Sequence, residues 1–400
     1  MRLLFLSFYY PPDLSAGSFR AAALTGALRE RAPPGTHIEV VTTVPNRYRT
    51  FTRAAPLLEQ QPGWELKRVP LPSHRSDMRG QVLAYRHYAR AVLSHVRDRS
   101  YDLVFVTSGR LMSAVLGAWI AQRKRARLYL DIRDIFVDTI KDVLPAPAAW
   151  CARGSFSLLE SWAVRRADRL NLVSPGFADY FRARYGDLPL SWFTNGVDTE
   201  FIAAAGAGAA PPEPDGRARI VYAGNIGEGQ ALHRVLPPLA AALRDRARFI
   251  VIGDGGRRAA LEAQLAACNS DNVEIRDPMP RSALLEAYRS AHVLFLHLGA
   301  VPAFEKVLPS KLFEYAALGK PVFAGVAGYA ARFVSEEIEN SALFAPGDVA
   351  GAVAAFDRLE LTDRPRPDFV AKYARTRIAS AMADEILALA GLPRATGVRR

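Results

Sequence analysis

The stretch ARIVYAGNIGEGQALHRVLPPLAAALRDRARFIVI at residues 218–252 decides the class of fold. It contains two short apolar runs, 218–223 and 247–252, with the length and composition of buried strands. A glycine-rich turn follows the first run, and residues near 230–245 show the apolar spacing of a helix. A strand, a turn, a helix and a further strand predict a parallel sheet that helices cover on both faces.

The same alternation continues on both sides of this stretch. Toward the C-terminus it predicts strands at 272–276, 292–297 and 320–324, and helices near 256–268, 281–290 and 310–318. Toward the N-terminus it predicts strands at 2–8, 37–43, 102–107, 127–132 and 169–173, and helices at 18–31, with Ser18 as cap, and 80–98. The fold class is therefore α/β, with two doubly wound parallel sheets.

Four hundred residues exceed one ordinary core, and an Ala-, Gly- and Pro-rich segment separates the two sets of strands. We expect an N-terminal domain at 1–200, a linker at 201–216 and a C-terminal domain at 217–366. One final helix at 367–391 is expected to cross back to the first domain, and a tail follows at 392–400.

The positive charge is concentrated in the first half of the chain. The net charge is +12, and residues 1–200 carry 28 Lys and Arg against 18 Asp and Glu. This imbalance suggests an anionic partner such as a membrane leaflet or a phosphorylated lipid, with simple solubility as the alternative. Nucleic acid is disfavoured, because neither a zinc spacing nor an RNA-binding signature is present.

No apolar run is long enough to cross a bilayer, since Pro11 and Pro12 soon end the first one. The two cysteines, Cys151 and Cys268, lie far apart and are expected to be unpaired thiols in a reducing compartment. We therefore expect a protein that is either cytoplasmic or peripheral at the inner face of the membrane.

The segment VLPSKLFEYAALGKPV at 307–322 contains the strongest candidate site. Ser310 is placed to cap a helix whose first backbone amides favour a diphosphate. Lys311 adds a positive charge that opposes the helix dipole, which a bound phosphate would compensate. Glu314 lies one turn further along the same side, where its carboxylate can accept hydrogen bonds from a ribose diol. The alternative is an ordinary capped helix.

Two glycine turns follow other strands of the same half. In YAGNIGEGQAL at 222–232, Gly224 allows close approach to a phosphate, and Asn225 and Gln230 supply neutral hydrogen-bond donors. GDGG at 253–256 opens with Gly253 and resembles the first turn. A tight turn without a ligand is the alternative for both.

Two loops of the N-terminal half carry further candidates. YYPPDLSAGSF at 9–19 places Gly17 before a helix, and LDIRDIFVDTI at 130–140 ends a buried strand. Arg133 is a candidate to stabilise the leaving phosphate or to orient the acceptor, and Asp134 a candidate to bind sugar hydroxyls. A structural ion-pair cluster is the alternative for the second loop.

Taken together, these motifs resemble the family 4 glycosyltransferases of the GT-B fold, which has two Rossmann-like domains facing a central cleft. The resemblance runs from FYYPP at 8–12 through SPGF at 174–177 and NGVD at 195–198 to GDG at 253–255 and FEYAALGKPV at 313–322. IRD at 132–134 and LPSKLFEY at 308–315 are most similar to amino-sugar transferases of bacterial surface-polysaccharide synthesis.

The resemblance assigns a role to each position that matches the family pattern. Glu314 matches the second glutamate of the paired-glutamate motif, which binds the nucleotide ribose. Ser310 and Lys311, with Leu312 beside them, match the diphosphate-binding turn. Asn225 and Gln230 stand near positions where many members place Arg and Lys, so the resemblance shifts phosphate neutralisation to Lys311 and Arg133.

Two departures from the family pattern concern the catalytic groups. The first glutamate of the motif would fall on Lys306, with Glu305 beside it, so either Glu305 reaches the sugar or Lys306 takes another role. The family's catalytic-site histidine is missing, and Arg133 and Asp134 occupy that region.

The resemblance implies a retaining transfer of a UDP-linked hexose or N-acetylamino sugar onto a glycan or lipid-linked acceptor. The nucleotide-sugar is a co-substrate, and we expect neither a metal nor another cofactor, because no metal-ligand spacing is present. The alternatives are a nucleotide-sugar epimerase of the same fold and a non-catalytic nucleotide-sugar-binding subunit. A nicotinamide oxidoreductase is disfavoured, since no G-x-G-x-x-G follows the first strand.

Overall fold

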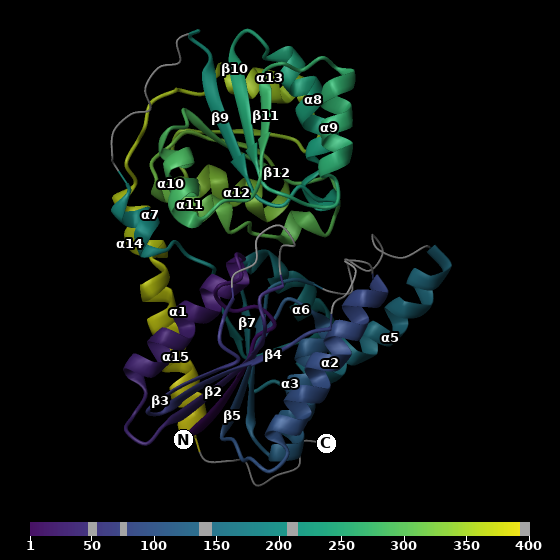
Figure 1. Ribbon diagram of the computed structural model, residues 1–400, viewed down its shortest axis with the longest axis vertical. Helices are drawn as coiled ribbons and strands as arrows, with labels where there is room; N and C mark the ends of the chain where they lie inside the picture. The colour runs from purple at the N-terminus through teal and green to yellow at the C-terminus, as the bar shows by residue number, and fades with distance from the viewer. Residues whose placement is uncertain (47–53, 73–77, 136–145, 206–214, 393–400) are drawn as a thin grey trace. The chain divides into compact units, whose positions relative to one another are not determined.

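A computed structural model describes residues 1–46, 54–72, 78–135, 146–205 and 215–392 of the chain. The chain divides into two compact units (Figure 1). Unit 1 comprises residues 1–194 and 376–400, and unit 2 comprises residues 195–375. The chain therefore passes from one unit to the other twice.

Unit 1 is built on an eight-stranded sheet in the order β3-β4-β2-β1-β5-β6-β7-β8. Its strands are β1 (Arg2–Leu6), β2 (His37–Thr43), β3 (Leu58–Gln61), β4 (Trp64–Val69), β5 (Leu103–Ser108), β6 (Arg127–Ile132), β7 (Arg169–Leu172) and β8 (Leu190–Ser191). All pairs are parallel except β3 with β4. The sequence did not lead us to expect β3 and β4, which are largely polar.

Helices cover both faces of this sheet (Figure 1). On one face, α1 (Ala16–Arg31) and α15 (Arg375–Gly391) share a core with β1, β2 and β5 that includes Phe105. On the other face, Gly117 of α3 (Leu111–Lys124) packs so tightly that a Cβ there would lie 2.1 Å from the Val106 side chain. The helices α2 (Met78–Val96), α5 (Ala146–Val164) and α6 (Ala178–Tyr185) complete the unit.

Unit 2 contains a six-stranded parallel sheet in the order β11-β10-β9-β12-β13-β14. The strands are β9 (Ala218–Ala223), β10 (Ala247–Ile252), β11 (Val273–Arg276), β12 (Val293–His297), β13 (Val322–Gly325) and β14 (Ser341–Phe344). Successive residues of β9 point into different hydrophobic cores. Ile220 and Tyr222 pack into one core, and Val221 and Ala223 pack into the other. This strand is thus buried on both faces, as its continuous apolar run predicts.

Two groups of helices cover the sheet of unit 2 (Figure 1). One core is closed by α8 (Leu232–Ala242), α9 (Arg258–Ala267) and α13 (Val349–Asp357). The other is closed by α7 (Thr199–Ala203), α10 (Arg281–Arg289), α11 (Lys311–Ala317), α12 (Gly328–Glu337) and α14 (Pro367–Tyr373). The predicted doubly wound α/β class is confirmed for both units.

The expectation of one continuous helix over 367–391 is wrong. The segment forms α14 and α15, and Ala374 between them adopts φ −55° and ψ 123°. The reason is backbone pairing, because the Val197 N–H donates to the Tyr373 carbonyl and the Arg375 N–H donates to the Val197 carbonyl, both at 2.8 Å. Ala374 thereby forms a parallel bridge with Val197 and leaves the helical conformation.

The start of α1 also differs from the expectation. Ser15, rather than Ser18, is the N-cap, and its hydroxyl accepts a hydrogen bond from the Ser18 N–H at 3.2 Å. Ser18 is buried inside the helix, and Gly17 lies in the first turn instead of preceding it. Within the described ranges, no helix has the length and apolarity needed to cross a bilayer.

Candidate functional site

The sheet of unit 2 has one point at which the strand order reverses. From β9 the chain continues to β10 and β11 on one side, whereas β12, β13 and β14 follow on the other. Loops 224–231 and 298–310 leave the carboxyl ends of the neighbouring strands β9 and β12. Ligands of open α/β sheets bind outside the carboxyl ends of strands at such a switch point. The candidate site of this unit therefore lies where the two loops begin.

The glycine turns after β9 and β10 pack directly against each other. A Cβ on Gly253 would lie 1.9 Å from the Gly224 carbonyl oxygen, so only a residue without a side chain fits there. The Ile226 N–H donates to the Asp254 carbonyl at 2.9 Å, and the Arg257 N–H donates to the Ile226 carbonyl at 2.9 Å. The two turns thus form one backbone framework at the sheet edge.

Asn225 and Gln230 are brought together inside the first turn. The Asn225 Nδ2 donates to Gln230 Oε1 at 2.9 Å, and the Tyr222 hydroxyl donates to the Asn225 carbonyl at 2.7 Å. Gly229 contacts the ring of Phe304 so closely that a Cβ would lie 2.8 Å from it. Phe304, on the loop after β12, therefore also packs against the turn after β9.

Lys311 and Glu314 occupy the first turn of α11 and form an ion pair of 3.0 Å between Nζ and Oε2. Glu314 is 6% exposed, and the Lys311 ammonium also lies 5.6 Å from the centre of the Tyr288 ring. A diphosphate and a ribose diol would take one charged group each.

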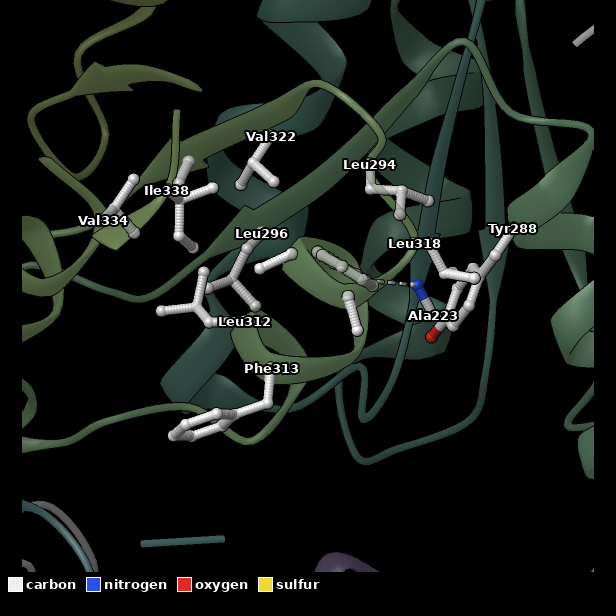
Figure 2. Packing of buried hydrophobic residues seen from close by; sticks show 14 of the residues in the cluster. Ala223, Tyr288, Leu294, Leu296, Leu312, Phe313, Leu318, Val322, Val334 and Ile338 are labelled. Carbon is white, nitrogen blue, oxygen red and sulfur yellow. Dashed lines mark hydrogen bonds between the residues drawn. The ribbon is translucent and has the colours of Figure 1, made fainter. Parts of the chain in front are cut away.

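Tyr315 ties α11 to the end of β9. Its hydroxyl accepts a hydrogen bond from the Ala223 N–H at 3.4 Å, drawn as a dashed line in Figure 2. Its ring meets the Tyr288 ring edge-on at 5.3 Å. Burial raises the pKa of the Tyr315 hydroxyl well above its usual value, so the phenol stays neutral. Lys311 and Glu314 are thereby fixed relative to the glycine turn.

The contacts of Ser310 and Leu312 at the start of α11 differ from those that the sequence suggested. Ser310 has helical backbone angles, and its hydroxyl makes no capping bond, so the expected N-cap is wrong. The Leu312 N–H donates to the Pro309 carbonyl at 3.2 Å, which engages one of the first amides. The Leu312 side chain is fully buried in the core (Figure 2).

Glu305 lies in the 3-10 turn η4 (Phe304–Lys306) with an exposed side chain. Its backbone is fixed by the start of α12, where Gly328 has φ +58° and a Cβ would lie 2.2 Å from the Glu305 carbonyl oxygen. The structure therefore places Glu305 on the loop after β12, five residues before Ser310 and six before Lys311, the first residue of α11.

Arg366 holds the C-terminal end of α11 in place, although no pattern in the sequence singles it out. Its buried guanidinium donates to the carbonyls of Ala316, Lys320 and Glu339. Burial lowers the pKa of Arg366 to about 10. These carbonyls belong to helix ends, where backbone acceptors have no partner within the helix.

His297 at the end of β12 was also not recognised as part of this site. Its Nδ1 lies 2.7 Å from the Gln230 carbonyl oxygen, and the Gly347 N–H donates to its Nε2 at 3.0 Å. A carbonyl only accepts and an amide only donates, so the ring must be the neutral tautomer with the proton on Nδ1. His297 thus holds the carbonyl of Gln230, and with it the glycine turn.

The pH dependence of unfolding follows from this arrangement. Burial lowers the pKa of His297 below 6.5, so the unfolded chain takes up the proton first as the pH falls. The contribution of the neutral His297 to the free energy of unfolding is fully present above about pH 6.5. Below that pH the contribution decreases by at most about 1.4 kcal/mol per pH unit. We expect the urea midpoint of the wild type to fall between pH 7.5 and 5.5 by more than that of His297→Asn.

Comparing the two proteins removes the contribution of other histidines such as His233, whose pKa burial also lowers. An equal decrease of the urea midpoint in wild type and His297→Asn contradicts the assignment of a neutral, doubly hydrogen-bonded ring.

Gly253→Ala tests the contact between the two glycine turns. The added methyl group would overlap the Gly224 carbonyl and force the turns apart, at a cost of about 1–3 kcal/mol in stability. We also expect UDP to bind at least tenfold more weakly, as measured by calorimetry. Gly256→Ala is the matched control, because a Cβ at that position meets open space. Equal UDP affinity of both variants would contradict the packing argument.

Unit 1 holds the remaining predicted residues, and the structure brings Gly17 and Arg133 together. A Cβ on Gly17 would lie 2.7 Å from Arg133 Nη1, so the glycine makes room for the guanidinium. Asp134 is exposed at the end of β6, and Asp138 of the same predicted cluster lies outside the described residues.

Asp131 of this cluster has a structural role. Its carboxylate is fully buried and binds the Arg20 guanidinium through two hydrogen bonds of 3.0 Å. Asn171 Nδ2 donates to the same carboxylate at 2.7 Å, and Arg20 Nη2 donates to the Phe193 carbonyl at 2.9 Å. For Asp131, the alternative of a structural ion pair is therefore confirmed. Its signal in the sequence is a polar residue inside an apolar strand.

Among the residues that the structure describes, no cluster of three or more His, Cys, Asp or Glu could hold a metal ion.

The two units match two family models. A Glycosyl transferase 4-like domain matches residues 19–189, and a Glycosyl transferases group 1 domain matches residues 209–377. The chain is 36% identical over 109 residues to WcaI of Escherichia coli (strain K12), a glycosyl transferase named for colanic acid biosynthesis. The match spans about a quarter of that curated relative, 26% of its length and 26% of this chain.

Solved structures show the same fold at low sequence identity. Trehalose-6-phosphate synthase from Burkholderia multivorans is 14% identical with a TM-score of 0.70, and each chain covers 97% of the other. WaaG, a glycosyltransferase involved in lipopolysaccharide biosynthesis, is 15% identical with a TM-score of 0.64 and 97% coverage of both chains. Anabaena HepE in complex with UDP-glucose is 17% identical, with a TM-score of 0.62 over 98% of this chain and 97% of that one.

Proposed function

Because this chain belongs to the glycosyltransferases of the GT-B fold, with a glycosyl transferase 4-like domain followed by a group 1 domain, we propose that it transfers a hexose or N-acetylamino sugar from UDP, with retention, onto a glycan or lipid-linked acceptor. The pathway would be the synthesis of a cell-surface polysaccharide. One observation carries the proposal: the Lys311–Glu314 pair stands beside a double glycine turn at the switch point of unit 2.

The donor contacts follow from the chemistry of these side chains. The Lys311 ammonium would neutralise the diphosphate, and the Glu314 carboxylate would accept hydrogen bonds from the ribose hydroxyls. The half-buried Gly224 would let the phosphates approach its backbone, and the buried Gly253 supports it by packing against its carbonyl. UDP as the nucleotide is supported by HepE, a protein of this fold that holds UDP-glucose.

In the proposed reaction, the bond between the anomeric carbon and the β-phosphate oxygen breaks while the acceptor hydroxyl oxygen bonds to that carbon. The departing phosphate takes the proton of the acceptor hydroxyl on the same face of the sugar, so no separate general base is needed. Negative charge grows on the diphosphate during this step. A preorganised cation such as Lys311 stabilises the transition state more than the ground state.

Three further assignments of the proposal concern residues outside this pair. Arg133 would assist at the leaving phosphate or orient the acceptor, while Asp134 and Glu305 would bind sugar hydroxyls. Gly17 leaves space beside Arg133, which supports a ligand-facing role for that guanidinium. An anionic membrane surface on the side of unit 1 is supported by the excess of positive charge in residues 1–200.

The experiment is a screen of nucleotide-sugars for a shift of the melting temperature, followed by NMR of the product made from the donor that binds. We expect a UDP-sugar to give the largest shift and the product to keep the anomeric configuration of the donor. Inversion would overturn the proposed mechanism. Formation of an epimer from the donor without acceptor would favour a nucleotide-sugar epimerase. Binding of the donor without any turnover would favour a non-catalytic subunit.

A further inference from the structure

The sheet of unit 1 has its own switch point, between β1 and β5. From β1 the chain leads to β2 and β4 on one side, and from β5 it leads to β6, β7 and β8 on the other. Loops 7–15 and 109–110 leave the adjacent carboxyl ends of these two strands. Ligands of open α/β sheets bind outside the carboxyl ends of strands at a switch point, so we expect a ligand of unit 1 here.

Arg110 stands at this point with its charge held in a defined position. Its guanidinium lies 4.2 Å from the centre of the Phe8 ring and donates to the Tyr9 hydroxyl at 3.1 Å. Other arginines of unit 1 pair with carboxylates, among them Arg20 and Arg127. No carboxylate in the described part of the chain pairs with Arg110, so an external anion would be its counterion.

The loop that positions Arg110 is held by several hydrogen bonds. The Thr43 hydroxyl donates to the Phe8 carbonyl at 2.7 Å, and Arg68 Nη2 donates to the Pro11 carbonyl at 2.9 Å. The Tyr10 hydroxyl is 2.7 Å from the Thr25 hydroxyl in α1. Phe8 and Tyr9 thus hold the guanidinium on a preorganised loop, which lowers the entropic cost of ligand binding.

The charges around Arg110 also favour an anion. Arg110 precedes α3, a helix of 14 residues with no acidic residue in its first turn and no side chain that caps it. The first backbone amides of a helix lack partners within the helix. The Ser113 N–H donates to the Arg110 carbonyl at 3.0 Å, so the amides of Leu111 and Met112 are the donors that this helix start adds to the guanidinium for an anion with several oxygens.

We propose that Arg110, held by Phe8 and Tyr9, binds a phosphate group of the acceptor at the switch point of unit 1. The acceptor role rests on the proposed glycosyl transfer, whereas binding of a phosphate does not. The acceptor would then carry a phosphate group, as a lipid diphosphate or a sugar phosphate does. The guanidinium fixes the position of this phosphate, and no bond to it is made or broken.

Arg110→Gln in the full chain tests the site, with inorganic pyrophosphate and geranyl diphosphate as probes in calorimetry. Saturating UDP is present, so that the probes do not occupy the donor site. We expect the Kd of both probes to rise at least tenfold in the variant. Tyr9→Phe should raise it less, about threefold, because the guanidinium keeps its charge and its contact with Phe8.

Arg123→Gln is the matched control, since Arg123 lies at the far end of α3 and is exposed. It should leave both Kd values unchanged, and circular dichroism should show that all variants are folded. Equal pyrophosphate affinity in wild type and Arg110→Gln overturns the site, as does the absence of pyrophosphate binding in wild type. Loss of pyrophosphate binding without any binding of geranyl diphosphate overturns the lipid-acceptor role.

The outcome separates this proposal from the proposed function. Arg110→Gln should bind UDP with the affinity of the wild type, because the donor residues lie in unit 2. If the wild type does not bind UDP, the proposed transfer fails, yet the pyrophosphate titrations still report on Arg110.

Discussion

Lys311→Ala is expected to lower kcat/KM for the donor by about 10²–10³. The reason is that removal of one preorganised donor at a developing anion typically costs about 2.7–4 kcal/mol of transition-state stabilisation. The variant also leaves the carboxylate of Glu314, which is 6% exposed, without its 3.0 Å partner. Steady-state kinetics with the donor found in the screen gives the first effect, and calorimetry with UDP gives the loss of binding.

Glu314→Gln distinguishes the two roles within the pair. It keeps the shape of the side chain but removes the charge, so we expect weaker UDP binding with a smaller change of kcat. Lys372→Ala is the control, because Lys372 pairs with Glu337 on the surface of the same unit. UDP affinity and kcat/KM that remain at wild-type values in both Lys311→Ala and Glu314→Gln would end the assignment of the donor site to α11.

Arg20→Met is expected to destabilise unit 1 by about 3–5 kcal/mol, the typical cost of removing one partner of a buried ion pair. Asp131 is fully buried and would keep only the hydrogen bond from Asn171 Nδ2 among those described for its carboxylate. The Phe193 carbonyl would also lose the donor on Arg20. Urea unfolding monitored by circular dichroism measures the loss.

Arg31→Met is the matched control on the same helix. Arg31 pairs with Asp384, but both side chains are exposed, so we expect little change in stability. Adding Asp131→Asn to Arg20→Met should restore part of the loss, because the unpaired charge is then gone. Equal unfolding midpoints for Arg20→Met and Arg31→Met would show that the buried pair contributes nothing.

The sequence predicted β9, β10, β12 and β13 of unit 2 because they are mostly buried and read as continuous apolar runs. It predicted the half-buried β11 as well, but β14 was not expected. The runs at 218–223 and 247–252 coincide with β9 and β10. In unit 1, β4 alternates polar and apolar residues and β3 is mostly exposed. β3 is the edge strand and β4 lies between β3 and β2. Both depend on their neighbours for pairing, which the sequence of one segment does not reveal.

The break at Ala374 was missed for a related reason. Apolar positions keep helical spacing on both sides of it, and only pairing with Val197, distant in the sequence, stops the helix. Local preference is overridden by such a long-range contact, as is common for helix ends.

For the site, residues were predictable where their type is unusual for their position. Lys311 in the first turn of a helix and the glycines after β9 are examples. His297, Tyr315 and Arg366 look like core or surface residues in the sequence, and their roles depend on backbone groups far along the chain: the carbonyl of Gln230, the amide of Ala223 and the carbonyl of Glu339. Hydrogen bonds to distant backbone leave no local pattern.

The division of unit 1 into two segments has a consequence for the newly made chain. Met382 and Ile386 of α15 complete the core that includes β1 and α1, and Tyr129 of β6 donates a hydrogen bond to Glu385. A ribosome makes residues 376–391 only after the whole of residues 195–375, so unit 1 cannot complete its core before all of unit 2 has been made. Residues 195–375 are contiguous and do not wait for a later segment. A fragment ending at residue 194 would expose an apolar face that invites aggregation.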